Sequence, residues 1–260
     1  MSTLISFHVE DEHIGIVTLN RKEAANALSL KLLDKLNKIA REIEKNDSIR
    51  CVIITGAGDK AFCAGADLKE RRRITEDEVI KTVTYIGETV LYIEKLQVPV
   101  IAAINGVAFG GGLELALACD IRLAANHVKM GLTETSLAII PGAGGTQRLP
   151  RLIGTGQAKR LIYTAVPIDA EEAYKIGLVE LLVTHDNLLQ EAKLLAKKIV
   201  SNGPIAVKQA KEAINKGIET DLYTGLTIEH QCYKQTIPTE DRLEGLQAFK
   251  EKRKPEYKGI

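Results

Sequence analysis

Three consecutive glycines constrain this chain more than any other feature. The apolar stretch Val98–Ile104 is typical of a buried strand, and it leads through a short turn into Gly110-Gly111-Gly112. Glu114 then stands at the head of an apolar helix expected over residues 113–118. Glycines weaken a fold unless the backbone must approach something closely, and a helix N-terminus attracts negative charge. The segment therefore predicts a cradle for an anion or oxyanion beside a carboxylate. A tight, closely packed turn between strand and helix is the alternative.

Strands and helices alternate on both sides of this cradle. We expect strands at Leu4–Val9, Ile14–Leu19, Cys51–Thr55, Pro99–Ile104 and Asp120–Ala125. Long helices are expected over residues 29–45 and 75–96, with Ser29 and Thr75 at their N-termini. Such alternation predicts an α/β fold built on buried parallel strands.

The chain after Pro150 reads as helical, apart from one strand at Leu178–Val183. Helices are expected over residues 157–164, 170–176, 188–201, 205–216, 222–235 and 242–252. We therefore divide the chain into a core over residues 1–190, which carries the site, and a helical region over residues 191–260. The helical region is expected to mediate assembly or to cover the site.

The bulk composition bears on partners and location. The 260 residues carry a net charge of +1, which gives no general attraction to nucleic acids or membranes. The four cysteines show neither C-x-x-C nor metal-site spacing, so we expect no bound metal and free thiols in a reducing compartment. The N-terminus lacks a signal-peptide pattern, and no apolar run reaches about 18 residues. These observations predict a cytoplasmic protein without membrane contact.

A second segment of small residues, Ala61–Glu70, follows the strand expected at Cys51–Thr55. Small side chains expose backbone N–H groups, so this loop can supply a second donor to an oxyanion hole. Asp67 reads equally well as a simple helix cap. The preceding Gly56-Ala57-Gly58 begins a match to the dinucleotide fingerprint, but the helix that this fingerprint requires is missing. Nucleotide-cofactor binding is therefore disfavoured.

A third segment, Met130–Leu149, places Glu134 in an apolar context beside another glycine-rich turn. A lone glutamate there is typical of a cap or an ion pair. Two glutamates beside glycine-rich loops, Glu114 and Glu134, form a candidate acid–base pair, since neighbouring carboxylates can hold different protonation states. Their proximity in space does not follow from their spacing in the sequence.

The three segments together resemble the enoyl-CoA hydratase/isomerase (crotonase) superfamily. The motifs are Ala64-Gly65-Ala66-Asp67-Leu68-Lys69, Asn105-Gly106 with Gly110 to Ala116, and Pro141-Gly142-Ala143-Gly144-Gly145-Thr146-Gln147-Arg148-Leu149. The resemblance implies a spiral of ββα units followed by a C-terminal helical region that builds a homotrimer or a homohexamer. It also implies an acyl-CoA thioester as substrate, with coenzyme A as part of that substrate and no separate cofactor.

The resemblance assigns roles to individual positions. The N–H groups of Ala66 and Gly111 would form the oxyanion hole for the thioester oxygen. Glu114 would act as the base toward water, and Glu134 would deliver the proton to Cα, although the two carboxylates can share this work. The substrate-binding positions implied are Ala64, Ala66, Asp67, Leu68, Lys69, Gly111, Pro141 and Gly142. Lys252 would reach the coenzyme A of a neighbouring subunit.

Within the family, three stretches are closest to the branch that hydrates methylglutaconyl-CoA. These stretches are residues 66–71, 130–135 and 235–245. We therefore expect hydration of a short or branched 2-enoyl-CoA, with 3-methylglutaconyl-CoA as a candidate and an enoyl-CoA isomerase as the alternative. The vertebrate member of that branch is described as binding RNA through a lysine-rich helix, which matches Lys31–Lys45 here. Acidic residues interleave with these lysines, so a solvated helix face is the favoured interpretation.

Overall fold

A computed structural model describes residues 3–72 and 74–260 of the chain. Its largest element is a sheet with the strand order β1-β2-β3-β5-β7-β10. The strands are β1 (Ile5–Glu10), β2 (Ile14–Leu19), β3 (Cys51–Gly56), β5 (Val100–Ile104), β7 (Ile121–Ala125) and β10 (Leu181–Val183). The first two form an antiparallel hairpin, and all later pairs are parallel. Every residue of β3 and β5 is buried, as expected for parallel strands that are covered on both faces.

A second, smaller sheet has the order β4-β6-β8-β9. Its strands are β4 (Ala61–Cys63), β6 (Val107–Phe109), β8 (Lys129–Gly131) and β9 (Ile168–Asp169). The sequence analysis did not predict these strands, because strands of two or three residues show no measurable alternation of apolar and polar positions. They pair with neighbours that are distant in the chain.

Successive turns of the chain repeat one unit. Each turn adds one strand to the large sheet, one strand to the small sheet and then a helix. The helices are α3 (Glu76–Glu94) after β4, α4 (Gly111–Leu117) after β6 and α5 (Gly145–Ile153) after β8. This arrangement confirms the predicted α/β class and the spiral of ββα units. In every unit the strand of the small sheet ends at the same side of the molecule. The loops before α4 and α5 follow such strands, so they come close to each other.

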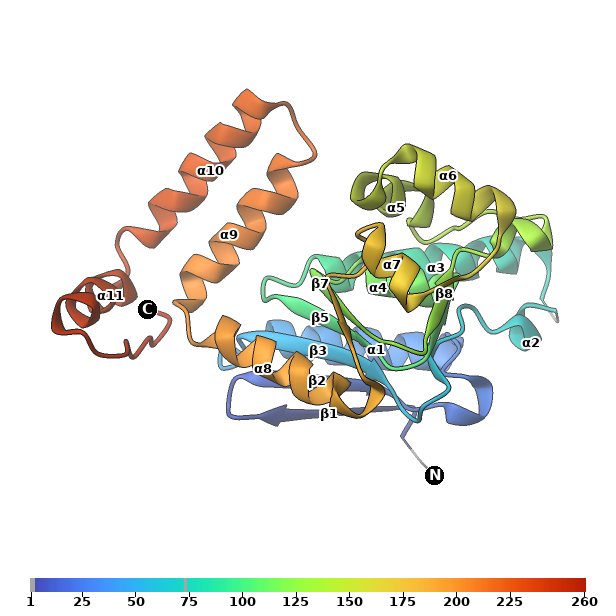
Figure 1. Cartoon of the computed structure of the whole chain (residues 1–260), viewed down its shortest axis with the longest axis horizontal. Helices are drawn as coiled ribbons and strands as arrows, with labels where there is room; N and C mark the ends of the chain where they lie inside the picture. Colours follow the sequence, from blue (N-terminus) through green and yellow to red (C-terminus); the bar gives the residue numbers. More distant parts are fainter. Residues whose placement is uncertain (1–2, 73) are drawn as a thin grey trace.

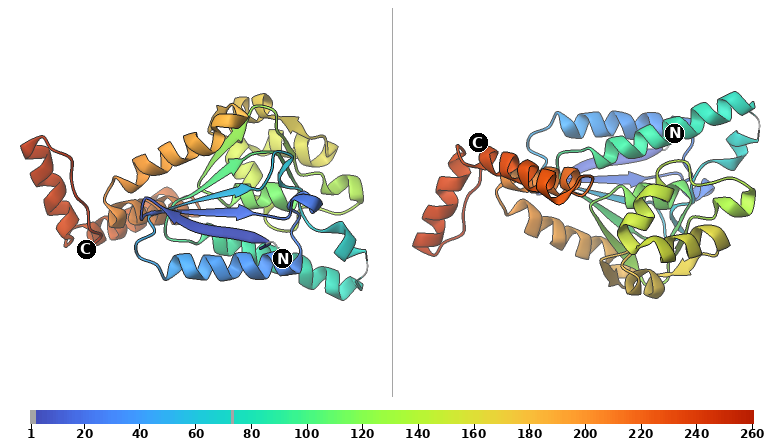
Figure 2. Two further views of the ribbon diagram at one scale, coloured as in Figure 1. Left: turned by 90° about the horizontal axis from the view of Figure 1, so that it is seen from below. Right: turned by 90° about the horizontal axis from the view of Figure 1, so that it is seen from above.

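Local sequence signals explain where the long helices begin. Ser29 accepts a hydrogen bond from Leu32 N at the start of α1 (Leu30–Glu44), as an N-cap does. Thr75 and Glu78 form a reciprocal capping box at the start of α3. The buried side chains of α1 are Leu32, Leu33, Leu36, Ile39, Ala40 and Ile43, which recur at helical spacing. α1 lies on one face of the large sheet and α8 (Leu188–Val200) on the other (Figure 2).

Three helices follow α8 and extend away from the body of the molecule (Figure 1). We call α9 (Pro204–Gly217), α10 (Leu222–Thr236) and α11 (Glu240–Glu251) the C-terminal arm. Helices α9 and α10 pack against each other. Lys211 of α9 ties the arm to the core, since its Nζ donates to Asp120 Oδ2 over 2.7 Å and to Val98 O over 3.0 Å. The division at residue 190 falls within α8, which packs on the large sheet, and it stays a prediction.

Six short elements complete the fold: η1 (Lys22–Ala24), α2 (Leu68–Arg71), η2 (Glu134–Leu137), α6 (Thr155–Thr164), α7 (Ala170–Lys175) and η3 (His185–Asn187). Two glycine-rich helix starts were not expected from the sequence. α4 begins at Gly111 rather than at residue 113, and α5, which begins at Gly145 and contains Pro150, was not predicted as a helix. In both cases glycines continue into the first helical turn, where the sequence pattern indicates a loop. Within the described residues, no helix is both long and apolar enough to cross a membrane.

The four cysteines are buried and carry free thiols. Burial raises the pKa of Cys51, Cys63 and Cys119 to about 12. These thiols are therefore protonated at neutral pH and act as small apolar side chains of the core.

Candidate active site

The two small-residue loops meet at the N-terminus of α4. A Cβ added to Gly65 would lie 3.3 Å from the N atom of Gly111 and 2.8 Å from Phe109 O. A Cβ added to Gly111 would lie 3.7 Å from the N atom of Ala66. Gly65 has a φ of +94°, which L side chains rarely adopt. The structure thus brings the two predicted oxyanion-hole residues, Ala66 and Gly111, side by side, and glycine permits the approach.

The backbone geometry leaves the N–H groups of Ala66 and Gly111 available. Leu28 forms a parallel bridge with Ala66 by donating to Gly65 O over 2.8 Å and accepting from Asp67 N over 3.2 Å. In such a bridge the N–H of Ala66 points away from Leu28. Gly111 is the first residue of α4, so its N–H has no acceptor within the helix. Two neighbouring amide donors at a helix N-terminus can bind an anionic oxygen.

Glu114 lies on the first turn of α4 and is 2% exposed. Its Oε1 accepts the N–H groups of Ala143 over 2.8 Å and of Gly145 over 2.7 Å. Burial raises the pKa of Glu114, and these two amide donors offset part of that increase. A buried carboxylate whose proton affinity is raised in this way is typical of an acid–base residue.

Glu134 begins η2 and is half-buried. A Cβ added to Gly110, the residue before α4, would lie 2.9 Å from Glu134 Oε1. Gly110 has a φ of +50° and accepts the N–H of Glu114 over 2.9 Å. The carboxylate of Glu134 therefore lies against the start of α4, and Glu114 follows within its first turn. The structure thus places both predicted glutamates at the start of α4, Glu134 against Gly110 and Glu114 on the first helical turn.

Arg148, which the sequence analysis quoted but did not select, contacts the segment that binds Glu114. Arg148 of α5 donates from Nε and Nη2 to the two carboxylate oxygens of Glu94, each over 2.7 Å. Its Nη1 donates to Ala143 O over 2.9 Å. An arginine inside a glycine-rich motif was the available signal, but its partner Glu94 is 54 residues away. No local pattern connects the two.

The loop that carries Ala66 is held in place by Asp67. Its Oδ1 accepts the N–H groups of Lys69 and Glu70, which caps α2, and its Oδ2 lies 2.6 Å from Arg21 Nη1. Burial alone would raise the pKa of Asp67, but Arg21 and the two amides outweigh it and lower that pKa. Asp67 thus has the structural role of a helix cap, which the sequence left as an alternative to substrate binding.

The other predicted substrate-binding positions surround this loop. Ala64 N donates to Ala25 O over 3.0 Å, while Leu68 and Lys69 are exposed. Pro141 is buried and Gly142 is exposed. A Cβ added to Gly142 would lie 2.5 Å from Val83 Cγ1 of α3, so this turn packs closely on α3. Substrate contact at these positions stays a prediction.

A cavity opens beside Ala66. The residues that line it are Leu28, Leu30, Ala66, Asp67, Glu70, Ile74, Thr82, Val83 and Ile86. Most of its wall is apolar and comes from α3 and from the start of α1. Such a cavity next to a pair of amide donors can hold the apolar part of a small ligand. Of these residues, the sequence analysis proposed only Ala66 and Asp67 for the site, since the apolar ones are equally typical of core positions.

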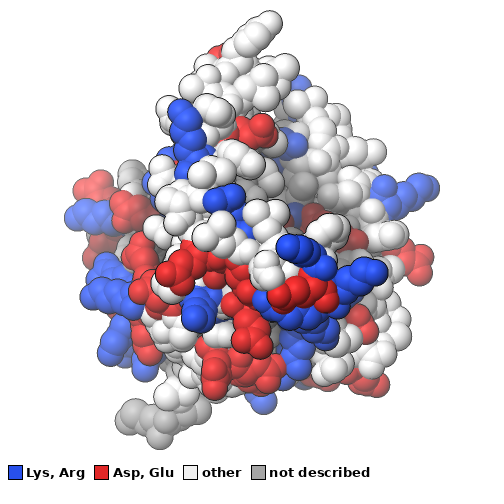
Figure 3. Space-filling view, turned by 90° about the vertical axis from the view of Figure 1, so that its left-hand side faces the viewer, with Lys and Arg blue, Asp and Glu red and all other residues white. Residues whose placement is uncertain are grey.

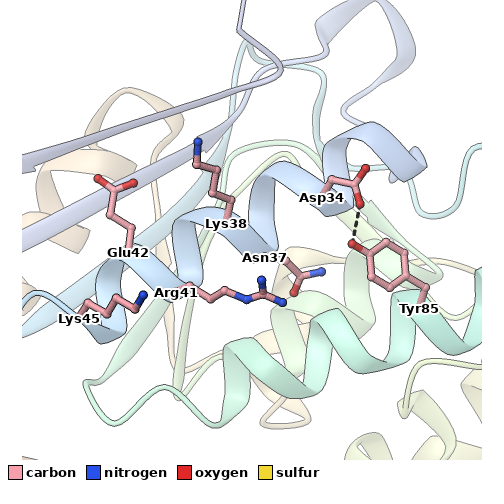
Figure 4. A pocket seen from close by; sticks show the side chains of 7 residues that line it. All are labelled: Asp34, Asn37, Lys38, Arg41, Glu42, Lys45 and Tyr85. Atoms are coloured by element: carbon pink, nitrogen blue, oxygen red, sulfur yellow. Dashed lines mark hydrogen bonds between the residues drawn. The ribbon is translucent and has the colours of Figure 1, made fainter.

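A second hollow lies between α1 and α3 (Figure 4), and neither Glu114 nor Glu134 lines it. Its lining residues are Asp34, Asn37, Lys38, Arg41, Glu42, Lys45 and Tyr85. The hydroxyl of Tyr85 donates to Asp34 Oδ1 over 2.6 Å. Charges of both signs alternate along this part of α1, which fits the solvated helix face favoured above. RNA binding at this helix stays untested.

Comparisons with known proteins find relatives that match most or all of this chain. Residues 10–260 match the family model described as enoyl-CoA hydratase/isomerase. The Bacillus subtilis (strain 168) protein YngF, which carries the same description in its name, is 60% identical over 260 residues, and the alignment covers all of both chains. The human mitochondrial methylglutaconyl-CoA hydratase is 52% identical over 258 residues, covering 97% of this chain and 76% of that protein. A crystal structure of an enoyl-CoA hydratase from Bacillus anthracis is 57% identical, with a TM-score of 0.98 over 99% of this chain and 100% of that one.

Proposed function

Because the chain belongs to the enoyl-CoA hydratase/isomerase family, we propose that it adds water across the 2,3 double bond of a 2-enoyl-CoA to give a 3-hydroxyacyl-CoA. The pairing of two glutamates at the start of α4 is the observation that carries this proposal. Hydration needs one group to activate water and another to protonate carbon, and paired carboxylates can do both.

The thioester oxygen binds between the N–H groups of Ala66 and Gly111 in this proposal. Negative charge grows on that oxygen when water attacks the conjugated double bond, so the amides stabilise the enolate-like species more than the substrate. Removal of one such donor costs about 3 to 4 kcal/mol of activation free energy in comparable sites. Both donors are backbone groups, which fixes their direction before the substrate arrives.

Glu114 is the proposed base and Glu134 the proposed acid. Two amides hold Oε1 of Glu114, which leaves Oε2 to accept a proton from the attacking water. Its raised pKa makes Glu114 a stronger base than an exposed glutamate. Glu134, against Gly110, then supplies a proton to Cα, and the two carboxylates can exchange these duties.

The acyl group occupies the cavity lined by α3 and the start of α1. A mostly apolar wall of limited size fits a short or branched chain. The similarity to the human methylglutaconyl-CoA hydratase supports 3-methylglutaconyl-CoA as the candidate substrate. Coenzyme A enters as part of the substrate, so no separate cofactor is proposed.

The C-terminal arm is the proposed assembly surface for a homotrimer or a homohexamer. It exposes an unusual number of large apolar side chains: Ile214, Ile218, Leu222, Tyr223, Leu226, Tyr233, Leu243, Leu246 and Phe249. The upper part of the molecule in Figure 3, where α9 and α10 reach away from the body, carries few charged side chains. Exposed apolar area of this kind marks an interface. Lys252 ends α11 and is proposed to reach the coenzyme A of a neighbouring subunit.

The proposed location is the cytoplasm, because its reducing conditions suit four free cysteines.

A substrate panel tests the proposed activity. Crotonyl-CoA and 3-methylglutaconyl-CoA are offered to the purified protein, and loss of the enone absorbance is followed in water enriched in ¹⁸O. Hydration incorporates the label into the product, whereas the alternative isomerase moves the double bond without taking up oxygen. We expect Glu114→Gln and Glu134→Gln each to lower kcat by about 10²- to 10⁴-fold. Turnover of neither substrate, or full activity of both variants, would overturn the proposal.

A further inference from the structure

We propose that Arg148 and Glu94 are positioning residues that hold the carboxylate of Glu114 in its working orientation through the segment Ala143–Gly145. The inference rests on the proposed role of Glu114 as the base. It concerns two side chains on different helices, α5 and α3, neither of which touches the substrate cavity directly.

Ala143 connects the two sides of this arrangement. Its N–H donates to Glu114 Oε1 over 2.8 Å, and its carbonyl accepts Arg148 Nη1 over 2.9 Å. The next residue, Gly144, has a φ of +101°, and Gly145 gives the second donor to Glu114. The direction of both amides toward Glu114 therefore depends on where Arg148 holds the carbonyl of Ala143.

Glu94 in turn fixes Arg148. The guanidinium presents two parallel N–H groups to the carboxylate, each over 2.7 Å, which sets both the position and the plane of the group. The side chains of Arg148 and Glu94 are 18% and 33% exposed, so solvent screens their charges only in part. A lysine at position 148 would keep the charge but could not bind Glu94 and Ala143 O in this planar geometry.

Arg148 on α5 is the cation whose field acts on Glu114, and that field must be separated from positioning. Glu94 on α3 binds this arginine, and Glu134 on η2 lies against Gly110 at the start of α4. The cation of Arg148 lowers the pKa of Glu114, although burial has the larger, opposite effect. Two explanations of any variant are thus open: a change in the local field or a loss of orientation.

Arg148→Lys distinguishes the two, because it keeps the positive charge. If positioning matters, kcat falls by about 10- to 100-fold while KM stays within about twofold, as expected when catalytic geometry loosens without loss of binding. The acid limb of kcat/KM also moves to higher pH, because Glu114 loses its two amide donors. A variant with the parent's kcat and pH profile would overturn the proposal.

Glu94→Met gives a second test in which the two explanations have opposite signs. Removal of the anion alone strengthens the field of Arg148 and lowers the pKa of Glu114. Release of Arg148 from its two hydrogen bonds with Glu94 disorders the Ala143–Gly145 segment and raises the pKa of Glu114. We expect the rise, and a fall would count against positioning.

A matched pair elsewhere in the fold provides the control. Arg122 of β7 also binds a glutamate, Glu180, and donates to two carbonyls, Leu178 O and Cys119 O. Arg122→Lys and Glu180→Met disturb an ion pair of the same type beyond the C-terminal end of α4, whereas Glu114 lies on the first turn of that helix. Both controls are expected to lower stability but to keep the parent's pH profile. A shift of the same size in the controls would show that any buried ion pair has this effect, and the proposal would fail.

The titration of Glu114 can be followed without substrate. Glutamate labelled with ¹³C at the carboxyl carbon gives a signal for Glu114 that Glu114→Gln identifies by its loss. We expect the midpoint to rise in Arg148→Lys and in Glu94→Met but not in the controls. If the parent protein turns over no enoyl-CoA, the proposed function fails, while this titration still decides whether Arg148 and Glu94 position Glu114.

Discussion

Gly145 donates its N–H to Glu114 Oε1 over 2.7 Å, and a Cβ added to Gly145 would lie 3.0 Å from that same oxygen. The added carbon would also lie 2.8 Å from Leu132 Cδ1. Glycine is thus required where the backbone holds the carboxylate of Glu114, because any side chain would push against the group that the amide binds. The same contact explains why a helix begins with glycine at a place where the sequence indicates a loop.

Gly145→Ala is expected to lower activity more than stability. Accommodating the methyl group requires a shift of Glu114 or Leu132, which costs about 1 to 3 kcal/mol in a packed interior. A displaced Glu114 should lower kcat by at least about tenfold. Thermal unfolding and steady-state kinetics measure the two effects. Gly156→Ala is the control: among the described residues its Cβ would meet nothing within 4 Å, and it lies in α6. We expect it to keep full activity and to gain about 0.5 to 1 kcal/mol.

Glu114→Gln is expected to make the fold more stable at neutral pH while it lowers activity. Burial raises the folded-state pKa of Glu114 above the value of 4.5 that it has when exposed, so the folded state binds the proton more tightly than the unfolded state. The parent therefore loses stability as the pH rises through the folded-state pKa. At pH 8 we expect a higher Tm for the variant, by about 2 to 4 °C per kcal/mol. The difference should shrink as the pH falls below 4.5, and a variant less stable than the parent at pH 8 would contradict the assignment.

Asp67→Asn should show the opposite pH dependence. Although burial opposes it, pairing with Arg21 and two amides lowers the folded-state pKa of Asp67, so its stabilising effect is present at neutral pH and is lost as the pH falls through that value. We expect a loss of about 1.5 to 3 kcal/mol at pH 7, typical of a hydrogen bond to a charged group. Denaturation curves at pH 7 and pH 3 measure it. Equal losses at both values would show that the charge of Asp67 is not what stabilises the loop.

The sequence predicted the large sheet and the long helices well because each has a local cause. Buried strands such as Cys51–Gly56 are continuous apolar runs, and α1 and α3 begin at capping residues. The small sheet has no such signal, since its strands are held by neighbours that the spiral supplies. A two- or three-residue strand exists because of its partners, and its partners are distant in the chain.

The candidate site shows the same contrast between features with a local sequence signal and contacts between distant residues. Residue type alone indicated Gly110–Gly112, Glu114 and Glu134 as candidates, because glycines and glutamates have few structural uses in apolar surroundings, and the family resemblance then pointed to Gly111. The contacts that orient them were out of reach: Ala143 and Gly145 lie 29 and 31 residues after Glu114. Only folding makes these residues neighbours.

Lys211→Met is expected to loosen the C-terminal arm. The Lys211 side chain is 9% exposed and bonds both Asp120 and Val98 O, so its loss should cost about 1.5 to 3 kcal/mol. Lys216, five residues further along α9, pairs with Glu212 in solvent, and Lys216→Met should leave stability unchanged. Chemical denaturation compares the two variants at one protein concentration, since assembly also affects stability. Equal effects would exclude Lys211 as the link between arm and core.

Charged substitutions on the arm are expected to break the assembly. Phe249 is 87% exposed and Ile218 is 70% exposed. In a single chain these apolar side chains contact water, and a second subunit that covers them removes this contact. Burial of one such side chain contributes about 1.5 to 3 kcal/mol, so its loss weakens each interface by at least about tenfold. We expect the parent to sediment at three or six times the chain mass of 28.4 kDa, and Phe249→Asp and Ile218→Asp to dissociate at micromolar concentration. Tyr163 of α6 is 71% exposed and lies outside the arm, so Tyr163→Asp is the control and should sediment like the parent.

If Lys252 completes a neighbour's site, activity at low protein concentration should fall in step with dissociation. Monomers that keep full activity would place every functional group within one chain.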